Sequence, residues 1–267
     1  MATRPNAVLS VAGVDSGGGA GIAADLKTFW AYGLWGTVAV TAVTAQNTLR
    51  VTAIEPVSPA LLTAQMRAVL EDFSVAAVKV GMVPNRSLAD AIVAVLGERG
   101  EPIPVVWDPV LVASSGDRLG TQEAVWTAVR SGHVWLLTPN LEEAGALVGR
   151  PLRTRQDMAA AAAELAACGA QAVLIKGGHL PGDEAADYLW DADGGTWWVS
   201  PRLPAQPTHG TGCTLSSAIA AGLARGLGLR EAVERARGFV REAILAQRPV
   251  GQGRWPVDPG WGCTPWI

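Results

Sequence analysis

The 267-residue chain has only three cysteines, Cys168, Cys213 and Cys263. Their number is odd and no pair has Cys-x-x-Cys spacing, which argues against a disulfide framework and against a zinc site. Lys and Arg number 21 against 24 for Asp and Glu, a formal charge of −3, so the chain lacks the basic surface of a nucleic-acid-binding protein. No apolar run is long enough to span a membrane, and the first one is too short for a secretory signal. We therefore expect a cytoplasmic protein that binds neither membranes nor nucleic acid.

Linkers and internal repeats are absent as well. No stretch rich in Pro, Gly and Ser divides the chain, which predicts one domain over residues 1–267. Short continuous apolar segments alternate with segments of helical character, and such strands are typical of a sheet that is covered on both faces. The alternation predicts an α/β fold with a mostly parallel central sheet and helices on both faces.

The boundaries of the expected elements follow from this alternation. The expected strands cover residues 7–12, 36–46, 51–56, 76–82, 103–110, 133–140 and 172–178, followed by a hairpin over 186–201. The expected helices cover 22–31, 58–71, 87–98, 121–130, 141–149 and 157–169, with one more after Cys213 and a last one over 230–246. Ser58 is the expected N-cap of the second helix. Five tryptophans are expected in the core: Trp30, Trp35, Trp107, Trp126 and Trp135.

Polar and glycine-rich segments follow the ends of the expected strands. They are residues 15–21, 46, 81–82, 108, 140–143, 176–178 and 210–213. Ligands of open α/β sheets bind beyond the carboxyl ends of the strands, so these segments are expected to meet at one site. The first segment is not a dinucleotide-binding motif, because a GxGxxG pattern that starts at Gly17 requires glycine where Ile22 stands.

The segment HGTGCT, residues 209–214, directly precedes an expected helix. Gly210 and Gly212 leave backbone N–H groups free to point in one direction, and the helix N-terminus adds a partial positive charge. This arrangement suits a phosphoryl group, although an ordinary glycine turn before a packed helix is the alternative. Cys213 lies at the same N-terminus, where a thiolate is favoured, and its alternative role is that of a small packing residue.

Other polar side chains admit both a functional and a structural interpretation. Asp108, Asn140 and Glu143 offer oxygen ligands of the kind that Mg²⁺ bound to nucleotide phosphates prefers. However, Asp-Pro is common at strand ends, and Asn140 also fits a helix N-cap. Lys176 follows an apolar strand, so its ammonium group either contacts phosphate or is solvated. Asp25 lies one helical turn beyond the first glycines and is either a ligand of a substrate hydroxyl or a helix surface charge.

Gln46 ends an expected strand. Its amide carries a donor and an acceptor, which complement the edge of an aminopyrimidine, where a ring nitrogen stands beside an exocyclic amine. Glutamine pairs with adenine in the same way. A glutamine that caps the strand is the alternative.

Seven motifs occur in a characteristic order: VAGVDSGGGAGIAADLKTF, TAVTAQNT, VKVGM, DPVLVASSGD, TPNLEEA, IKGGH and HGTGCTLSSAIAAGLARG. Over residues 7–247 the chain resembles the hydroxymethylpyrimidine/phosphomethylpyrimidine kinases of thiamine biosynthesis, which are members of the ribokinase-like superfamily. The resemblance implies an enzyme that uses ATP and Mg²⁺, and a homodimer is expected. Its implied substrates are 4-amino-5-hydroxymethyl-2-methylpyrimidine and the monophosphate of this alcohol, which is converted to the diphosphate.

The resemblance also implies roles for individual residues. The implied pyrimidine pocket consists of Gly13, Asp25, Gln46, Met82 and Val110. The implied nucleotide contacts are Asn140, Glu143 and Lys176, and the implied magnesium ligands are Asp108 and Glu143. The implied catalytic loop is Gly210, Thr211, Gly212 and Cys213, and its cysteine stands where many ribokinase relatives carry an aspartate base. The chain departs from the family at Ser114, where many members have lysine.

Two other functions compete with this one. A pyridoxal-type vitamin kinase has the same fold and shares the DPV and IKGGH motifs. Gln46 favours the aminopyrimidine, because the neighbouring edge of pyridoxal carries a phenolic oxygen. A ligand-binding sensor without turnover is the third possibility, and the intact loop of residues 210–213 together with Glu143 argues against it.

Overall fold

The computed structural model describes residues 6–113, 115–204 and 206–263, so Ser114 lies outside the described residues. The strands are β1 (Ala7–Val14), β2 (Trp35–Gln46), β3 (Val51–Pro56), β4 (Val75–Val80), β5 (Val105–Trp107), β6 (Leu136–Leu137), β7 (Ala172–Ile175), β8 (Glu184–Asp191), β9 (Gly194–Pro201), β10 (Thr208–His209) and β11 (Trp255–Pro256). The helices are α1 (Gly21–Ala31), α2 (Pro59–Asp72), α3 (Arg86–Gly97), α4 (Gln122–Arg130), α5 (Leu141–Val148), α6 (Arg155–Ala167), α7 (Thr211–Ala224) and α8 (Leu229–Leu245).

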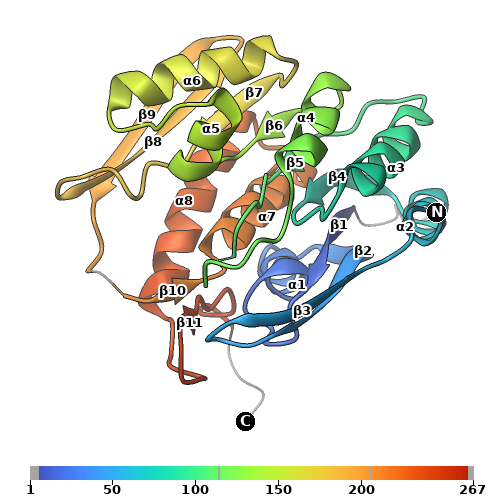
Figure 1. Cartoon of the computed structure of the whole chain (residues 1–267), viewed down its shortest axis with the longest axis horizontal. Coiled ribbons are helices and arrows are strands. Elements are labelled where there is room, and N and C mark those ends of the chain that lie inside the picture. The colour runs from blue at the N-terminus through green and yellow to red at the C-terminus, as the bar shows by residue number, and fades with distance from the viewer. Residues whose placement is uncertain (1–5, 114, 205, 264–267) are drawn as a thin grey trace.

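A nine-stranded sheet runs through the molecule in the order β3-β2-β1-β4-β5-β6-β7-β8-β9 (Figure 1). The strands from β2 to β7 in this order are parallel, whereas β3 at one edge and β8 and β9 at the other are antiparallel. The predicted α/β fold with a mostly parallel sheet is therefore confirmed. The prediction of one domain over residues 1–267 stays a proposal, and the single large sheet supports it.

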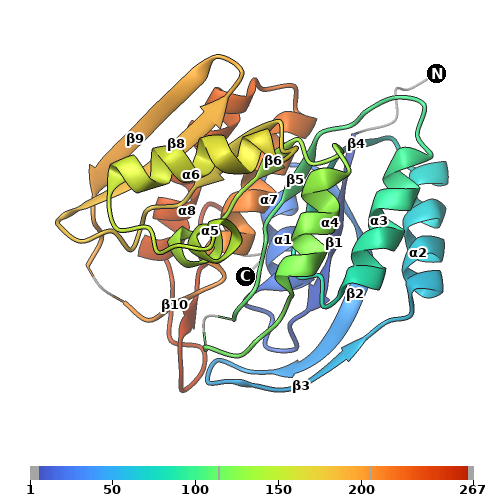
Figure 2. The same ribbon diagram turned by 45° about the horizontal axis from the view of Figure 1, so that its top comes forward.

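Helices cover both faces of the sheet, as predicted (Figure 2). On one face α2, α3, α4 and α6 enclose an apolar core that includes Met66, Ile92 and Leu165. On the other face α1, α7 and α8 enclose a second core around Phe29 and Ile219. The apolar residues of α7 are buried on every side, which is typical of a helix enclosed by other elements. Within the described part of the chain, no helix combines the length and the apolar character needed to cross a membrane.

Two predicted strands are much shorter than expected. The strand predicted over 103–110 covers only β5, and that over 133–140 covers only β6. Pro109 and Pro139 follow these strands, and proline has no N–H to donate to a neighbouring strand. The chain therefore leaves the sheet early and places the segments around Asp108 and Asn140 at the carboxyl edge.

The helix starts agree with the local capping signals. Ser58 is the N-cap of α2, as predicted, and its Oγ accepts a hydrogen bond from the N–H of Leu61 (3.2 Å). The helix expected after Cys213 begins earlier, at Thr211, so the cysteine lies in the first turn of α7. This shift places the thiol directly at the positive end of the helix.

The prediction of a tryptophan core is only partly correct. Trp107 is 1 % exposed, and Trp126 and Trp135 are half-buried. Trp30 and Trp35 are 73 % and 62 % exposed, so their predicted burial is wrong. The helix α1 packs on the sheet with neighbouring residues such as Phe29, which turns Trp30 toward solvent. Trp35 is the first residue of β2, directly after the connection from α1, and its side chain is exposed there.

Candidate active site

The turn after β1 is organised by the carboxylate of Asp15. Its Oδ1 accepts from the N–H of Gly17 (2.8 Å), and its Oδ2 accepts from those of Gly19 (3.0 Å) and Ala20 (2.9 Å). The Nε2 atom of His209 lies 3.0 Å from the same Oδ2. Burial alone raises the pKa of Asp15, but the hydrogen bonds from His209 and the backbone outweigh this effect and lower the pKa below its usual value.

Glycine permits two close backbone contacts beside this turn. A Cβ atom on Gly210, which has a φ of +83°, would lie 2.0 Å from the carbonyl oxygen of Gly19. A Cβ atom on Gly21, with a φ of +55°, would lie 2.2 Å from that of Gly13. Only glycine fits at these positions. The turn after β1 and the start of α7 therefore touch through their backbones.

The N-terminus of α7 carries Cys213. Gly210 caps the helix without a side chain, so the first N–H groups, beginning at Thr211, have no partner within the helix. The Sγ atom of Cys213 accepts from the N–H of Gly21 (3.4 Å), and the residue is partly exposed. Desolvation raises the pKa of Cys213 to about 11, although the Lys79 ammonium opposes this shift, so the surroundings disfavour the expected thiolate. The role of the cysteine as a base stays a prediction.

A second group lies beside α7 and joins the ends of β5 and β7. Lys176 Nζ donates to Asp108 Oδ1 (2.8 Å) and lies 3.9 Å from Glu143 Oε2. Asp108, which is 1 % exposed, also accepts from Thr138 Oγ1 (3.1 Å). A Cβ atom on Gly212 would lie 3.3 Å from Lys176 Nζ and 3.4 Å from Asp108 Oδ2. The glycine loop thus lies beside the carboxylate–lysine cluster of Asp108, Glu143 and Lys176.

Asn140 and Glu143 form a capping box at the start of α5. Asn140 Oδ1 accepts from the N–H of Glu143 (2.8 Å), and Glu143 Oε2 accepts from the N–H of Asn140 (2.7 Å). The interpretation of Asn140 as an N-cap is confirmed, and its contact with nucleotide stays a prediction. Burial raises the pKa of Glu143 to about 7; Lys176 opposes this shift, and Asp108 adds to it.

The carboxylate–lysine cluster fits a magnesium ion that is shared with phosphates. Among the described residues, no group of three or more His, Cys, Asp or Glu side chains forms a metal site by itself. Mg²⁺ commonly takes one or two carboxylates and completes its shell with phosphate and water oxygens. Asp108 and Glu143 supply two buried carboxylates against one ammonium group, so their charge favours a cation beside them.

The residues predicted to line a pyrimidine pocket are distributed over the ends of β1, β2, β4 and β5 and over α1. Gly13 lies against Met82, because a Cβ atom on the glycine would be 2.8 Å from the methionine Sδ. Met82 is buried, and its carbonyl oxygen accepts from Thr41 Oγ1 (2.7 Å) on β2. Val110 is half-buried in the loop after β5. The structure brings Gly13 and Met82 together, whereas the contact of Val110 with the ring stays a prediction.

Asp25 lies in a fully buried hydrogen-bonded network. Its carboxylate pairs with Lys79 Nζ (2.8 and 2.9 Å) and accepts from Ser10 Oγ (2.6 Å) and Ser217 Oγ (2.7 Å). The alternative of a helix surface charge is therefore wrong. Burial opposes a charge on Lys79, but Asp25 outweighs this effect and raises the lysine pKa. No role is predicted for Lys79 from the sequence, although a charged residue in the apolar strand VAAVKV indicates a buried partner.

Gln46 lies at the end of β2 and faces the start of α7. Its amide Nε2 lies 3.5 Å from Nε2 of His209, and its Oε1 lies 3.3 Å from Thr44 Oγ1. Its backbone is held by Ser16, whose hydroxyl donates to the Gln46 carbonyl oxygen (2.7 Å). Asp15 was expected at the site only as part of the segment 15–21, and no role of its own was predicted for Asp15 or for His209. Their pairing joins residues that are 194 positions apart, so no local pattern reveals it.

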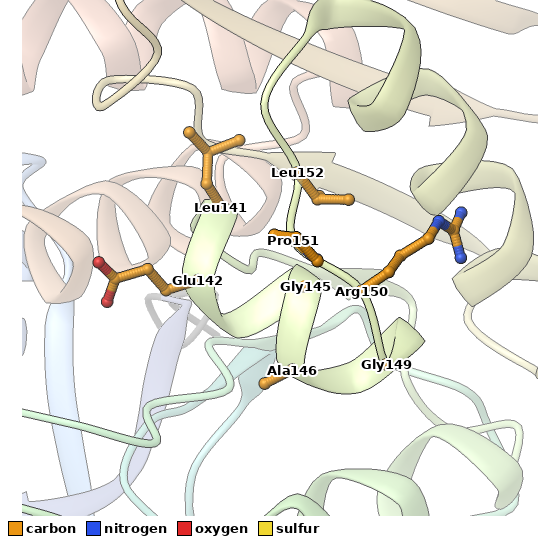
Figure 3. Close-up of a pocket in the computed structure, with 8 residues that line it drawn as sticks. All are labelled: Leu141, Glu142, Gly145, Ala146, Gly149, Arg150, Pro151 and Leu152. Carbon is orange, nitrogen blue, oxygen red and sulfur yellow. The ribbon is translucent and has the colours of Figure 1, made fainter.

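A separate hollow of about 500 Å³ lies on the outer side of α5 (Figure 3). It is lined by Leu141, Glu142, Gly145, Ala146, Gly149, Arg150, Pro151 and Leu152. Neither Cys213 nor the carboxylate–lysine cluster lines this hollow. It is therefore distinct from the candidate active site, and we assign it no ligand.

The fold and the site define a class of protein. A mostly parallel sheet with a glycine-capped helix N-terminus and acidic and basic side chains at its carboxyl edge is the architecture of ribokinase-like kinases. The chain is similar to a pyridoxal kinase from Bacillus subtilis, solved as an ADP complex, with a TM-score of 0.87 and 32 % identity over 96 % of this chain and 98 % of that one. It is also similar to a phosphomethylpyrimidine kinase from Clostridium difficile 630, with a TM-score of 0.77 and 37 % identity over 91 % and 100 % of the two chains.

Sequence comparison narrows the class to one family. The family model described as phosphomethylpyrimidine kinase matches residues 15–258. The hydroxymethylpyrimidine/phosphomethylpyrimidine kinase of Rhizobium meliloti is 48 % identical over 93 % of this chain and 95 % of its own length. The protein of the same name from Streptomyces coelicolor is 45 % identical over 96 % of this chain and 95 % of its own length. The chain belongs to the phosphomethylpyrimidine kinase family, which confirms the family predicted from the order of the motifs.

Proposed function

We propose that the chain transfers the γ-phosphoryl group of ATP to the hydroxymethyl oxygen of 4-amino-5-hydroxymethyl-2-methylpyrimidine. A second transfer converts the monophosphate to the diphosphate, which serves thiamine biosynthesis. The observation that carries this proposal is the position of Cys213 in the first turn of α7, next to Gly212, on which a Cβ atom would lie 3.3 Å from Lys176 Nζ and 3.4 Å from Asp108 Oδ2. A group that accepts a proton and an anion-binding helix terminus thus lie in one loop, and the charged cluster lies beside this loop.

Phosphoryl transfer depends mainly on positioning and on electrostatic stabilisation. The free N–H groups at the start of α7 and the Lys176 ammonium bind the oxygens of the transferring group. The substrate oxygen bonds to the γ-phosphorus while the bond to ADP breaks, and Cys213 Sγ takes the hydroxyl proton. Because the pKa of the thiol is raised, only its minor thiolate form accepts this proton. Asp108 and Glu143 would hold a bound Mg²⁺, which would supply neutralisation of negative charge on the phosphates.

A pyridoxal-type kinase is the second candidate. The similarity to a Staphylococcus aureus pyridoxal kinase in complex with pyridoxal, with a TM-score of 0.87 and 31 % identity, favours it. Gln46 and the 45–48 % identity to the two pyrimidine kinases named above favour the aminopyrimidine.

Measuring ATP consumption with the aminopyrimidine alcohol, its monophosphate and pyridoxal separates these functions. Turnover of the alcohol and of its monophosphate supports the proposal, and turnover of pyridoxal alone overturns it. Binding of an alcohol without any ATP consumption would identify a ligand-binding protein instead.

Gln46→Glu is expected to weaken recognition of the aminopyrimidine, because a carboxylate has no N–H to donate. The loss in kcat/KM corresponds to about 1–3 kcal/mol, the value of one bidentate pairing between an amide and a base. Steady-state kinetics with the alcohol as the varied substrate measures it. Gln171→Glu, at an exposed position, is the matched control. A Gln46→Glu enzyme with wild-type KM and kcat would show that this residue does not contact the ring.

Glu143→Gln is expected to lower kcat, and raised magnesium is expected to restore part of the loss. The substitution keeps the size of the side chain but removes a carboxylate from the carboxylate–lysine cluster, so less charge is available to hold the cation. Titration of kcat against magnesium concentration checks this result. Glu142→Gln changes the preceding residue, whose side chain is exposed, and should leave the magnesium titration unaltered. Normal turnover with an unaltered magnesium dependence in Glu143→Gln would contradict the assigned role.

The same variant tests the raised pKa of Glu143 in magnesium-free buffer. The folded pKa of about 7 exceeds the usual 4.5, so between these values the folded protein binds more protons than the unfolded chain. The stability of the wild type relative to Glu143→Gln should therefore fall as the pH rises through this window. Urea denaturation at several pH values measures the difference, and a constant difference would show that the carboxyl is not buried in this way.

We also propose that the chain forms a homodimer. The exposed side chains of Trp30 and Trp35 near the α1–β2 connection support a contact between copies. Sedimentation equilibrium tests it against the 27.7 kDa mass of one chain. The cytoplasmic location stays a prediction of the sequence analysis.

A further inference from the structure

His209 contacts two functional side chains through one ring nitrogen. Its Nε2 atom lies 3.0 Å from Asp15 Oδ2 and 3.5 Å from the amide of Gln46. The other end of this amide lies 3.3 Å from Thr44 Oγ1. The Thr44 hydroxyl itself donates to the carbonyl oxygen of Val14 (2.9 Å). These contacts form a chain of hydrogen bonds that ends on backbone groups at both sides.

The position of one proton in this chain follows from Asp15. Its carboxylate accepts three backbone N–H groups, and an ionised carboxylate can only accept hydrogen bonds. The Nε2 atom of His209 therefore carries a proton and donates it to Asp15. A bare Nε2 would place two lone pairs against each other at 3.0 Å.

The proton on His209 in turn decides the orientation of the Gln46 amide. The oxygen and nitrogen of a glutamine amide are nearly equal in size, so their hydrogen-bond partners decide which atom lies where. A protonated Nε2 has no lone pair, so it cannot accept from the amide NH₂ group; its one N–H, which Asp15 accepts at 3.0 Å, favours the amide oxygen at the position that faces it at 3.5 Å. Thr44 Oγ1, whose proton points at Val14, instead offers a lone pair to a donor. We propose that Asp15 and His209 hold the Gln46 amide with its oxygen on His209 and its NH₂ group on Thr44, so that His209 is a positioning residue for substrate selectivity.

This inference rests on the proposed function, because it concerns which substrate ring forms hydrogen bonds with Gln46. An amide offers two donors and two acceptors, and the two contacts leave one of each for the substrate. A 4-aminopyrimidine presents an acceptor at its ring nitrogen and a donor at its amine, whereas the 4-oxo analogue presents the reverse pattern. A freely rotating amide pairs with both rings after a half-turn. An amide that is held in one orientation pairs with only one of the two rings. By holding the amide, His209 excludes the 4-oxo ring.

The ratio of kcat/KM for the 4-amino alcohol to that for its 4-oxo analogue tests the proposal. We expect this ratio to fall by about 5- to 150-fold in His209→Phe, which has no donor, because the amide is then free to turn. His209→Gln places an N–H donor at a similar reach and should keep the ratio near that of the wild type. His133→Gln, away from these contacts, is the control. An unchanged ratio in a folded His209→Phe enzyme would overturn the proposal.

A measurement on the wild-type protein tests the same point without an activity assay. Long-range ¹H–¹⁵N correlation spectra report which nitrogen of each of the three histidines carries a proton, and spectra of His209→Gln and His133→Gln assign the signals. We expect a protonated Nε2 at His209. An unprotonated Nε2 would overturn the proposal even if the kinetic ratio changed. If the wild type phosphorylates no aminopyrimidine alcohol, the proposed function fails, and the spectrum still decides whether His209 holds the amide.

Discussion

Cys213→Ala is expected to lower kcat by about 10²- to 10⁴-fold, the usual contribution of a positioned general base. The substitution removes the proton acceptor, but it leaves the backbone N–H groups at the start of α7 in place. The KM for ATP should therefore change much less than kcat. Cys168→Ala is a matched control, since this cysteine is exposed at the end of α6. A folded Cys213→Ala enzyme with wild-type kcat would show that the cysteine is a small packing residue and not the base.

The pH dependence of kcat/KM gives a second test of Cys213. Because the thiol pKa is raised to about 11, the thiolate fraction grows about tenfold per pH unit below that value. The wild-type profile should therefore rise with pH through the neutral and mildly alkaline range. In Cys213→Asp the base is already ionised in this range, so the remaining activity should depend far less on pH. Parallel profiles of the two enzymes would contradict the assignment of the cysteine as base.

Lys79→Met is expected to lower the free energy of unfolding by about 3–5 kcal/mol, the usual loss when one partner of a buried ion pair is removed. Both side chains of the Lys79–Asp25 pair are fully buried. The substitution leaves Asp25 charged in the interior with only the hydroxyls of Ser10 and Ser217 as side-chain donors. Urea denaturation measures the loss as a lower midpoint at an unchanged slope.

Two further variants separate the buried charge from simple packing. Lys79→Met combined with Asp25→Leu should recover part of the loss, because no unpaired carboxylate then remains inside. Arg67→Met breaks the exposed pair of Arg67 and Glu98 and should move the midpoint far less, since exposed ion pairs stabilise proteins only weakly. A single Lys79→Met variant as stable as the wild type would show that Asp25 becomes protonated at little cost.

Much of the fold was predictable from local patterns in the sequence. Alternating apolar strands and helices predicted the sheet and its two layers, because burial on both faces leaves continuous apolar segments in the chain. Ser58 and Asn140 marked helix starts, since a cap requires only a side chain and the N–H groups that follow it. The predicted strands around Asp108 and Asn140 are too long, because Pro109 and Pro139 have no N–H to donate to a neighbouring strand and the pairing of each strand ends before them.

The sequence by itself determined the α/β class, the family and the set of loops that meet at the active site, since each of these depends on residue type and order along the chain. Only the tertiary structure decided the state of the individual groups. Asp25 is buried by Lys79 and by Ser217, which is 192 positions away. The pKa of Cys213 follows from desolvation by distant elements rather than from the helix start alone. The contact of His209 with Asp15 likewise forms only when the two loops meet. Charge states depend on surroundings in three dimensions, and no spacing along the chain records them.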